Sequence, residues 1–464
     1  MSIKSFFEYP LIRFLSHITF GKMKRHYVEK KEKYKFKQNF EFYRLYKEEV
    51  ERNKLANLDD INLKKLNIGK CMALSIAFDG KLRLSPEDKG KRIIKCYNIY
   101  VNSINYVGYE TNDKNIYFIA SQYSSYWGYF DNKFNFYPFS NPDVTFGLPL
   151  YPLEVNNRLK KLKKKISIFS VLKIYRKKIL LFSTWNLGHH IWNEQPGIDT
   201  LIKFNLLKNF SYLYYFIDYF DMSLFLNTKN IKSKYIKSKN FCTHDLIIYF
   251  TEYVFLNNTS DRLLAYCKSM TESIVQKNEI IIIITIRQNR RIWREELIGI
   301  PKIINNISEK YENISFYIDG FSKPSREGDG FKTENNIVED YSKYEIIKEN
   351  LSLKGRNNTR SIIGQTCIEK INTFDKASFL VMPFGSPEHY NWIVKKDIIL
   401  YGPKEARQLS TVLNSHIIIP DINIDSYKIK QQHITNEING DYSMDWRILY
   451  DAMCDKINKL KQSV

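Results

Sequence analysis

The feature that most constrains the fold of this 464-residue chain is an alternation of strand and helix patterns between residues 279 and 420. Short apolar runs recur there, and stretches with helical spacing of apolar residues separate them. The runs are EIIIIITI (279–286), ISFYIDG (314–320), RSIIG (360–364), SFLVMP (378–383), DIILYG (397–402) and HIIIP (416–420). Because this alternation is typical of a parallel sheet with helices on both faces, the sequence predicts a doubly wound α/β domain.

The first half of the chain has a different pattern. Residues 70–150 contain short apolar runs, with turn signals such as FDGK and ETNDKN between them. The runs include MALSIAF (72–78), NIYVNSINYVGY (98–109) and NIYFIAS (115–121). These features predict short β-strands joined by hairpins. The last stretch, residues 444–462, has helical spacing and predicts a closing helix.

The net charge of +21 suits a polyanionic partner such as nucleic acid, an anionic membrane surface or a phosphorylated substrate, although lysine-rich composition alone gives part of it. Two stretches, residues 1–45 and 155–178, carry much of the excess. In the first, Leu11, Phe14 and Ile18 share a helical face ahead of a lysine-rich block. This arrangement predicts either a segment lying on an anionic membrane or a helix packed on its own domain with a solvated basic tail.

The six cysteines lie far apart, with no CxxC pair or Cys/His cluster. This spacing argues against a structural zinc site and fits buried thiols in a reducing compartment. No signal peptide is recognisable, and no run reaches the ~18 apolar residues that a membrane-spanning helix needs.

The stretch KKILLFSTWNLGHHIWNEQPG, which ends at Gly197, combines a buried-strand pattern with two adjacent histidines. Helical spacing follows it, so the sequence places Gly188, His189 and His190 at the carboxyl end of a strand, where open α/β sheets bind ligands. Two neighbours on an extended chain point in different directions, so we expect one histidine to face a cleft and the other to pack. A histidine is a natural general base for a hydroxyl, with Glu194 and Asp199 as competing bases. The alternative is a hydrogen-bonded structural histidine.

The sequence TIRQNRR follows the central strand at 279–286 and places Arg287, Arg290 and Arg291 in one strand–helix loop. Guanidinium groups bind phosphate oxygens, and the amides of a helix start add to such a site. We therefore expect a phosphate-binding loop. The alternative is a set of solvated arginines that pair with Glu295 and Glu296.

A third candidate is MPFGSPEHYNW (382–392), where a strand ends at a glycine-containing loop. Gly385 permits close approach of the backbone, and Ser386 is a suitable cap for a helix that opens at Pro387. Exposed amides there can hold an anion, and Glu388 or His389 can meet sugar or ribose hydroxyls. The alternative is an ordinary capped helix.

Several motifs are absent from the sequence. It has no GxxxxGK[ST] loop, no GxGxxG after a strand and no GxSxG turn, which argues against a P-loop ATPase, a dehydrogenase and an α/β-hydrolase. No DxD segment closes a strand, so the usual metal–diphosphate anchor of metal-dependent glycosyltransferases is missing.

Taken together, these segments resemble bacterial surface-polysaccharide glycosyltransferases of the two-Rossmann, GT-B kind. Three parts carry the resemblance: the basic leader LIRFLSHITFGKMKRHYVEKKEKYK, the segment GHHIWNEQPG, and FDKASFLVMPFGSPEHYNWIVKKDIILYG. The more usual His-Gly-Ala-Gly type of loop is replaced by Phe384-Gly385-Ser386-Pro387. The resemblance implies an α/β fold with two Rossmann-like domains and a basic amphipathic N-terminal segment. It covers about half of the chain at the level of pattern.

The resemblance also implies roles for particular residues. His189 or His190 deprotonates an acceptor hydroxyl, with Glu194 as a further catalytic candidate. The arginines and the Gly385–Ser386 amides stabilise the leaving nucleotide diphosphate in place of a metal. The full set of implied donor-binding residues is Arg287, Arg290, Arg291, Asp319, Gly385, Ser386, Glu388 and His389. No metal and no cofactor besides the nucleotide-sugar substrate is expected.

The expected organisation has three parts: a basic segment at 1–45, an acceptor-side domain with a β-rich start at 46–270, and a Rossmann-like nucleotide-sugar-binding domain at 271–464. The expected partners are a nucleotide-sugar, a glycan or lipid-linked glycan acceptor and an anionic membrane surface, with no nucleic acid. The basic stretches would hold the enzyme on the inner face of the cytoplasmic membrane. Two alternatives stay open: a basic nucleic-acid-binding protein, and a non-catalytic scaffold for polysaccharide assembly.

Overall fold

The computed structural model describes residues 60–85, 88–101, 104–120, 125–139, 151–164, 177–182, 187–203, 205–222, 226, 231–236, 240–251, 257–270, 279–288, 292–327, 333–383, 388–402, 417–418 and 441–462. The predicted basic segment at 1–45 lies outside this part of the chain, as do residues 165–176 of the second basic stretch. The described residues fall into two compact units: those up to Lys178 together with Asn240–Phe250, and Ile179–Lys239 together with Thr251 onward. The sequence-based boundary after residue 270 stays a prediction.

An antiparallel sheet forms the centre of the first unit. Its strands follow the order β1-β2-β3-β4-β5-β6, and β11 pairs with β2. Their bounds are β1 (Lys81–Leu82), β2 (Lys91–Val101), β3 (Ile104–Thr111), β4 (Ile116–Ala120), β5 (Ser125–Phe130), β6 (Phe136–Pro138) and β11 (Phe241–Thr243), with β12 (Leu246–Ile248) after them. Helices α3 (Asp60–Asp79) and α4 (Pro152–Lys164) belong to the same unit. The hairpins predicted for residues 98–121 are therefore confirmed.

One strand prediction in this unit is wrong. MALSIAF, residues 72–78, forms the end of helix α3 rather than a strand. The side chains from Ile68 to Ala77 are all buried, so this part of the helix has no polar face. A short apolar run without a polar face cannot be assigned to helix or strand from its periodicity alone.

Aromatic side chains fill the core between this sheet and α4. The ring of Trp127 lies 4.6 Å from that of Tyr106 and 4.4 Å from that of Phe136. Val155 and Leu159 of α4 pack against the same cluster. Large aromatic side chains on one face of alternating strands therefore explain why this helix covers the sheet.

The second unit begins with a small parallel sheet. Strands β7 (Lys178–Phe182), β8 (Tyr212–Tyr215) and β10 (Lys232–Tyr235) lie in the order β10-β8-β7. Between β7 and β8 come α5 (Leu187–His189), the π-helix η3 (His190–Glu194), α6 (Gln195–Lys203) and η4 (Leu207–Asn209). The resemblance implies a Rossmann-like acceptor-side domain with a β-rich start over residues 46–270. The described residues of this range form the antiparallel sheet, which is the β-rich start, and this one strand–helix–strand unit.

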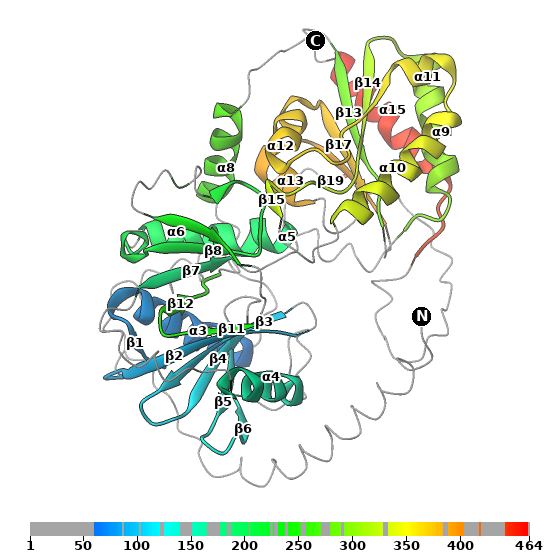
Figure 1. Cartoon of the computed structure of the whole chain (residues 1–464). Coiled ribbons are helices and arrows are strands. Elements are labelled where there is room, and N and C mark those ends of the chain that lie inside the picture. Colours follow the sequence, from blue (N-terminus) through cyan, green and yellow to red (C-terminus); the bar gives the residue numbers. More distant parts are fainter. Residues whose placement is uncertain are drawn as a thin grey trace, which may run out of the picture. The chain divides into compact units, whose positions relative to one another are not determined.

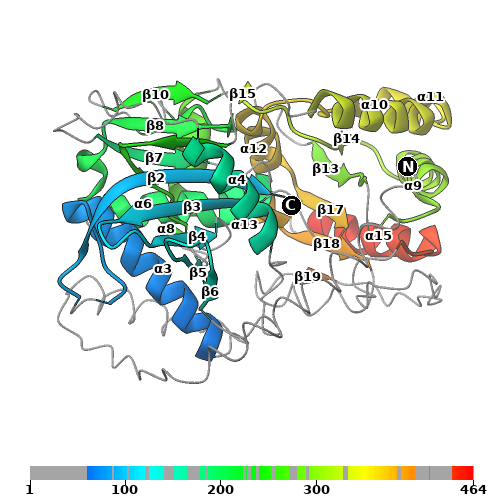
Figure 2. The ribbon, with the colours of Figure 1, turned by 60° about the horizontal axis from the view of Figure 1, so that its bottom comes forward.

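The main sheet of the second unit has six parallel strands among the described residues, in the order β16-β14-β13-β17-β18-β19. Figure 2 shows β14, β13, β17 and β18 side by side in this order. The strands are β13 (Ile280–Thr285), β14 (Ile314–Asp319), β16 (Thr359–Ser361), β17 (Phe379–Pro383), β18 (Ile398–Tyr401) and β19 (Ile417–Ile418). Each overlaps one of the six runs found in the sequence, although β16 ends before the isoleucines of its run, so the predicted parallel α/β arrangement is confirmed. A short antiparallel pair, β9 (Ile217–Asp218) and β15 (Arg326–Glu327), connects the two parts of this unit.

Helices cover both faces of the main sheet (Figure 1). They are α9 (Glu296–Lys310), α10 (Thr333–Glu349), α11 (Leu353–Asn357), α12 (Cys367–Lys376), α13 (Glu388–Val394) and α15 (Trp446–Gln462), and α8 (Asn257–Ser269) packs outside α12 and α13. Helices α9, α10 and α15 share one hydrophobic cluster with the sheet, whereas α12 and α13 contact each other and α8. Thr366 and Glu369 form a capping box that starts α12 at Cys367.

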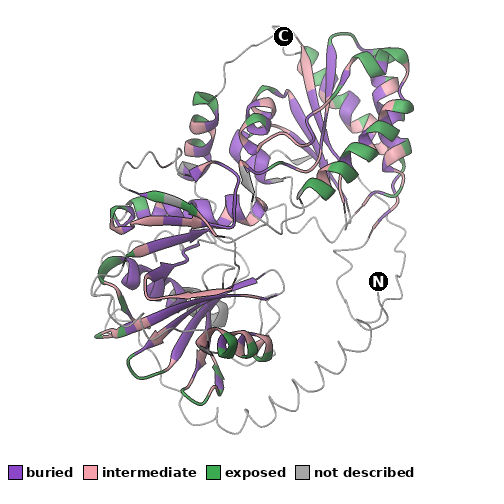
Figure 3. Cartoon of the chain, in the orientation of Figure 1, coloured by how far each residue is buried: buried purple, intermediate pink, exposed green. Residues whose placement is uncertain are grey.

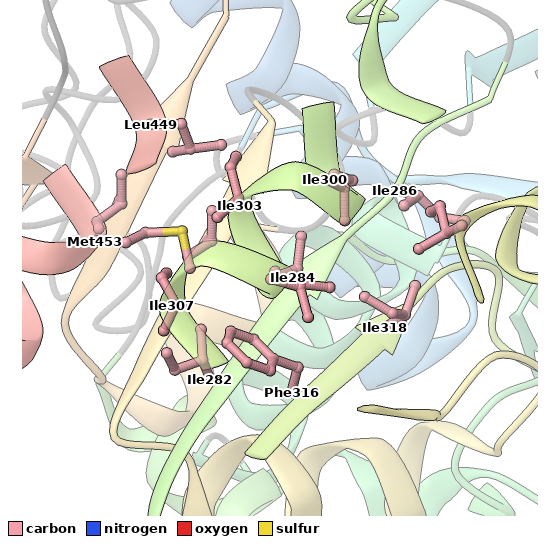
Figure 4. Packing of buried hydrophobic residues seen from close by; sticks show 14 of the residues in the cluster. Ile282, Ile284, Ile286, Ile300, Ile303, Ile307, Phe316, Ile318, Leu449 and Met453 are labelled. Carbon is pink, nitrogen blue, oxygen red and sulfur yellow. The ribbon is translucent and has the colours of Figure 1, made fainter. Parts of the chain in front are cut away.

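The core between the sheet and α9 consists mainly of isoleucine (Figure 4). Ile282 and Ile284 of β13 face Ile303 and Ile307 of α9, and Met453 of α15 closes the cluster. The strands are buried along their length while the outer sides of the helices are exposed (Figure 3). Branched side chains buried on both faces of a central strand therefore hold the sheet's carboxyl edge in place.

Candidate functional site

The strand order of the main sheet defines a switch point between β13 and β17. Strand β13 pairs in parallel with β14 on one side and with β17 on the other. The chain leaves β13 towards α9 on one face and leaves β17 towards α13 on the other face. In open α/β sheets, the crevice at the carboxyl ends of two such strands is where ligands bind. The segments after β13 and β17 are therefore the candidate site.

The structure describes some of the predicted site residues at this crevice and not others. Arg290, Arg291, Gly385 and Ser386 lie outside the described residues. The described part of helix α13 runs from Glu388, and the side chain of Glu388 is itself outside the description. The proposed roles of these residues stay predictions.

Helix α10 holds the segment after β13 in place. Lys343 donates a hydrogen bond from Nζ to the backbone oxygen of Arg287 at 2.6 Å. Gln288 donates from Nε2 to Oδ1 of Asp340 at 2.5 Å. Burial raises the pKa of Asp340 to about 6, against the opposing effect of its hydrogen bond from the Phe321 amide. Two side chains of one helix thus fix the backbone that carries Arg287, which is itself half-buried.

Glu296, the first residue of α9, is a buried carboxyl group that sequence reasoning did not place in the site. The sequence offers Glu296 as a partner of solvated arginines, whereas in the structure this residue is only 2% exposed. Burial raises its pKa to about 8, although Lys343, with Nζ 4.0 Å from Oε2, and the backbone amide of Arg287 oppose the change. The sequence did contain a signal, because Glu296 occupies the same helical stripe as the buried Ile300 and Ile303.

Asp319 closes β14 as predicted, but both of its carboxylate oxygens are engaged inside the protein. Lys370 of α12 donates to Oδ1 at 2.6 Å and to the backbone oxygen of Gly320 at 2.6 Å. Thr285 donates to Oδ2 at 3.0 Å. Asp319 and Lys370 are almost fully buried, so this ion pair joins the ends of β13, β14 and α12. Direct binding of a donor by Asp319 stays a prediction.

Lys370 is a second buried charged residue that sequence reasoning did not place in the site. It lies among Cys367, Ile371 and Phe374, which are the buried apolar residues of α12. A lysine on the apolar stripe of a helix needs a buried anionic partner, and that requirement was the available signal. The partner could not be named from the sequence, because Asp319 lies 51 residues earlier.

The histidine segment is helical, and the expectation of an extended chain at His189 and His190 is wrong. His190 is fully buried; its Nδ1 donates to Oε2 of Glu194 at 2.7 Å, and Gln195 donates from Nε2 to its Nε2 at 3.1 Å. His189 is half-buried, and its Nδ1 donates to Oδ1 of Asn193 at 2.8 Å, which makes its Nε2 the acceptor nitrogen. Burial lowers the pKa of His189, so its ring is neutral near pH 7. These surroundings favour His189 over His190 as a base.

His389 brings the histidine segment and the segment after β17 together. Its ring lies 6.0 Å from that of Trp192, edge to face, and it is 3% exposed. Burial and the nearby Lys370 lower its pKa to about 3. Among the predicted site residues, the structure therefore places the π-helical segment beside α13 within one compact unit.

Among the described residues, no group of three or more His, Cys, Asp or Glu side chains has an arrangement that could hold a metal ion. None of the described helices is both long enough and apolar enough to span a bilayer.

No protein-family model matches the chain, and no curated protein matches its sequence. Among solved structures, it is similar to E. coli ADP-heptose lipopolysaccharide heptosyltransferase II, with 8% identity over 61% of this chain and 99% of that chain and a TM-score of 0.35. It is also similar to a family 9 glycosyl transferase from Veillonella parvula, with 11% identity over 53% and 88% of the two chains and a TM-score of 0.29. A trehalose-6-phosphate synthase shares 11% identity over 67% and 72%, with a TM-score of 0.27.

Proposed function

We propose that this protein is a glycosyltransferase of the GT-B kind that moves a sugar from a nucleotide-sugar donor to a glycan or lipid-linked glycan acceptor. The single observation that carries the proposal is the switch point between β13 and β17, with Arg287 directly beyond β13. A crevice of this kind accommodates a nucleotide, and a guanidinium group suits its phosphates.

The donor lies at this crevice in the proposal. Arg287, with Arg290 and Arg291 in the same segment, neutralises the charge that develops on the leaving diphosphate, so the reaction needs no metal. The Gly385–Ser386 amides contribute to the same task, and Glu388 orients the donor. Lys343 and Asp340 act on this site indirectly, because they hold the backbone around Arg287.

On the acceptor side, His189 is the proposed base. Asn193 orients its ring through Nδ1, and burial lowers its pKa, so a neutral imidazole is present to take the proton of an acceptor hydroxyl. His190 and Glu194 support the segment through their buried hydrogen bond. In this proposal the β7–α6–β8 unit has the role of the acceptor-side domain of the GT-B arrangement, with fewer strands and helices.

The basic stretches lead us to propose an anionic membrane surface as a partner, on the cytoplasmic side, where lipid-linked acceptors of surface polysaccharides are assembled. Helix α4 exposes Lys160 and Lys161 from the second basic stretch. Lysine-rich surfaces of this kind bind anionic lipid headgroups electrostatically.

Thermal unfolding in the presence of UDP, GDP, CDP, CMP, ADP or dTDP, with EDTA throughout, tests this function. We expect one nucleotide to raise the unfolding temperature, and we expect Arg287→Ala to abolish that rise. Arg356→Ala is the matched control. Arg356 is exposed on α11, and this helix leads into the amino end of β16, whereas the candidate site lies at the carboxyl ends of the strands. This variant should leave the nucleotide effect unchanged.

Other outcomes would support the competing functions. No effect of any nucleotide, together with salt-sensitive binding of random oligonucleotides, would favour a nucleic-acid-binding protein. No effect of a nucleotide and no oligonucleotide binding would favour a scaffold. A rise that needs a divalent cation would contradict metal independence while keeping the transferase.

A further inference from the structure

One buried polar group near the switch point has unmet hydrogen-bonding capacity. Within the described part of the chain, neither ring nitrogen of His389 has a hydrogen-bond partner, although the side chain is only 3% exposed. Leaving buried polar atoms unpaired is unfavourable, and native proteins rarely do so without a functional reason. His389 lies at the start of α13, directly after the segment that leaves β17.

Polar groups next to Tyr390, the chain neighbour of His389, already bind each other. The hydroxyl groups of Tyr390 and Ser322 are hydrogen-bonded, and Sγ of Cys367 lies 3.7 Å from the same Tyr390 hydroxyl. Lys370 is bonded to Asp319 and to a backbone oxygen. These hydrogen bonds do not include either ring nitrogen of His389.

The surroundings also fix the charge of the ring. Burial and the Lys370 ammonium disfavour the imidazolium form, and the pKa of about 3 keeps the ring neutral at physiological pH. A neutral imidazole has one N–H donor and one acceptor nitrogen. It therefore suits hydroxyl groups, which both donate and accept, and it offers a phosphate no charge.

We propose that His389 binds hydroxyl groups of the nucleotide-sugar donor, on the ribose or on the transferred sugar, and does not bind the diphosphate. This inference rests on the proposed function and deepens it, because it divides the donor site into two parts. The arginine segment beyond β13 takes the phosphates, and His389 beyond β17 takes hydroxyls.

Two substitutions separate this role from a structural one. His389→Phe keeps a ring that packs against Trp192 and Tyr390 but removes both nitrogens. It should leave the unfolding temperature equal to that of the wild type or raise it, because the unpaired atoms are gone. We expect it to weaken binding of the donor about tenfold to a hundredfold, since the ligand's hydroxyls lose their partner. His389→Gln, which retains one donor and one acceptor, should recover part of the affinity.

Isothermal titration of wild type and both variants with UDP-glucose, GDP-mannose and ADP-glucose, the matching diphosphates and their 2′-deoxy forms, identifies the hydroxyl. A contact with the ribose 2′-hydroxyl predicts that His389→Phe weakens ribonucleoside diphosphates and leaves the 2′-deoxy forms unaffected, whereas a contact with the 3′-hydroxyl predicts that both are weakened and inorganic pyrophosphate is not. A contact with the transferred sugar predicts weaker binding of the nucleotide-sugar alone. Equal loss for every ligand, inorganic pyrophosphate included, would show a phosphate contact and overturn the inference.

The two proposals fail in different ways. If the wild type binds a nucleotide-sugar and His389→Phe binds it with the same affinity, the inference about His389 is wrong and the transferase proposal stands. A lower unfolding temperature of His389→Phe with unchanged affinity would likewise show a structural histidine. If the wild type binds none of these ligands and no nucleotide of the thermal-unfolding panel, the transferase proposal and this inference are both overturned.

Discussion

Replacing Glu296 with glutamine should make the protein more stable at alkaline pH. The pKa of this buried carboxyl is about 8 in the folded protein, against an ordinary value of 4.5. The folded state therefore keeps a proton that the unfolded chain releases above pH 4.5. Stability from this group is fully present below that pH and is lost as the pH rises towards 8. At about 1.4 kcal/mol per pH unit, the loss between pH 5 and pH 8 is about 4 kcal/mol.

Glutamine cannot ionise, and its oxygen can still accept the backbone N–H of Arg287. Urea unfolding of wild type and Glu296→Gln at pH 5, 6, 7 and 8 should give free energies of unfolding that diverge steadily, with the variant ahead at pH 8. Glu309→Gln is the control, because Glu309 is exposed on the same helix, and its profile should parallel that of the wild type. Parallel profiles for wild type and Glu296→Gln would refute the reasoning, since they would show that Glu296 is ionised in the folded protein at neutral pH.

Two further substitutions test the packing around the candidate site. Lys370→Met leaves the buried carboxylate of Asp319 without a cation, so urea unfolding should show a loss of about 3–5 kcal/mol; an unchanged midpoint would mean that the pair contributes nothing. Gly299→Ala places a Cβ 2.1 Å from Cη2 of the buried Trp293 ring. We expect overpacking to cost about 1–3 kcal/mol and to exceed alanine's gain of about 1 kcal/mol in helix propensity, so a raised unfolding temperature would contradict this account.

The strands of the main sheet could be predicted because burial on both faces leaves a simple mark in the sequence. The isoleucine run at 280–284 and the run at 379–383 each became a central strand. The same mark misled us at 72–78, where a helix without a polar face gives an equally continuous apolar run. The length of the element and the residues that flank the apolar run decide between helix and strand. Here the helix begins twelve residues before the run.

The site was harder to predict, because its key contacts join residues far apart in the chain. The adjacent histidines were recognised as notable, but a π-helical turn, not a loop, sets their partners: one bonds within the core to Glu194 and Gln195, and the other to Asn193. No local pattern specifies that arrangement. Sequence reasoning identifies unusual polar residues, whereas their partners depend on which helices the sheet brings together.

The buried charged groups of the Rossmann-like part are not distributed evenly. Among the residues described from Glu279 onward, the buried acidic, lysine and histidine side chains are Glu296, Asp319, Asp340, Lys370 and His389, and all lie at or against the carboxyl ends of β13, β14 and β17. Three of them have pKa values moved to about 8, 6 and 3. Burying charge disfavours folding, so a sheet stabilised mainly by isoleucine gains little from such groups. Their concentration at the edge where α/β sheets bind ligands is the pattern expected when part of the stability is given up for a binding site.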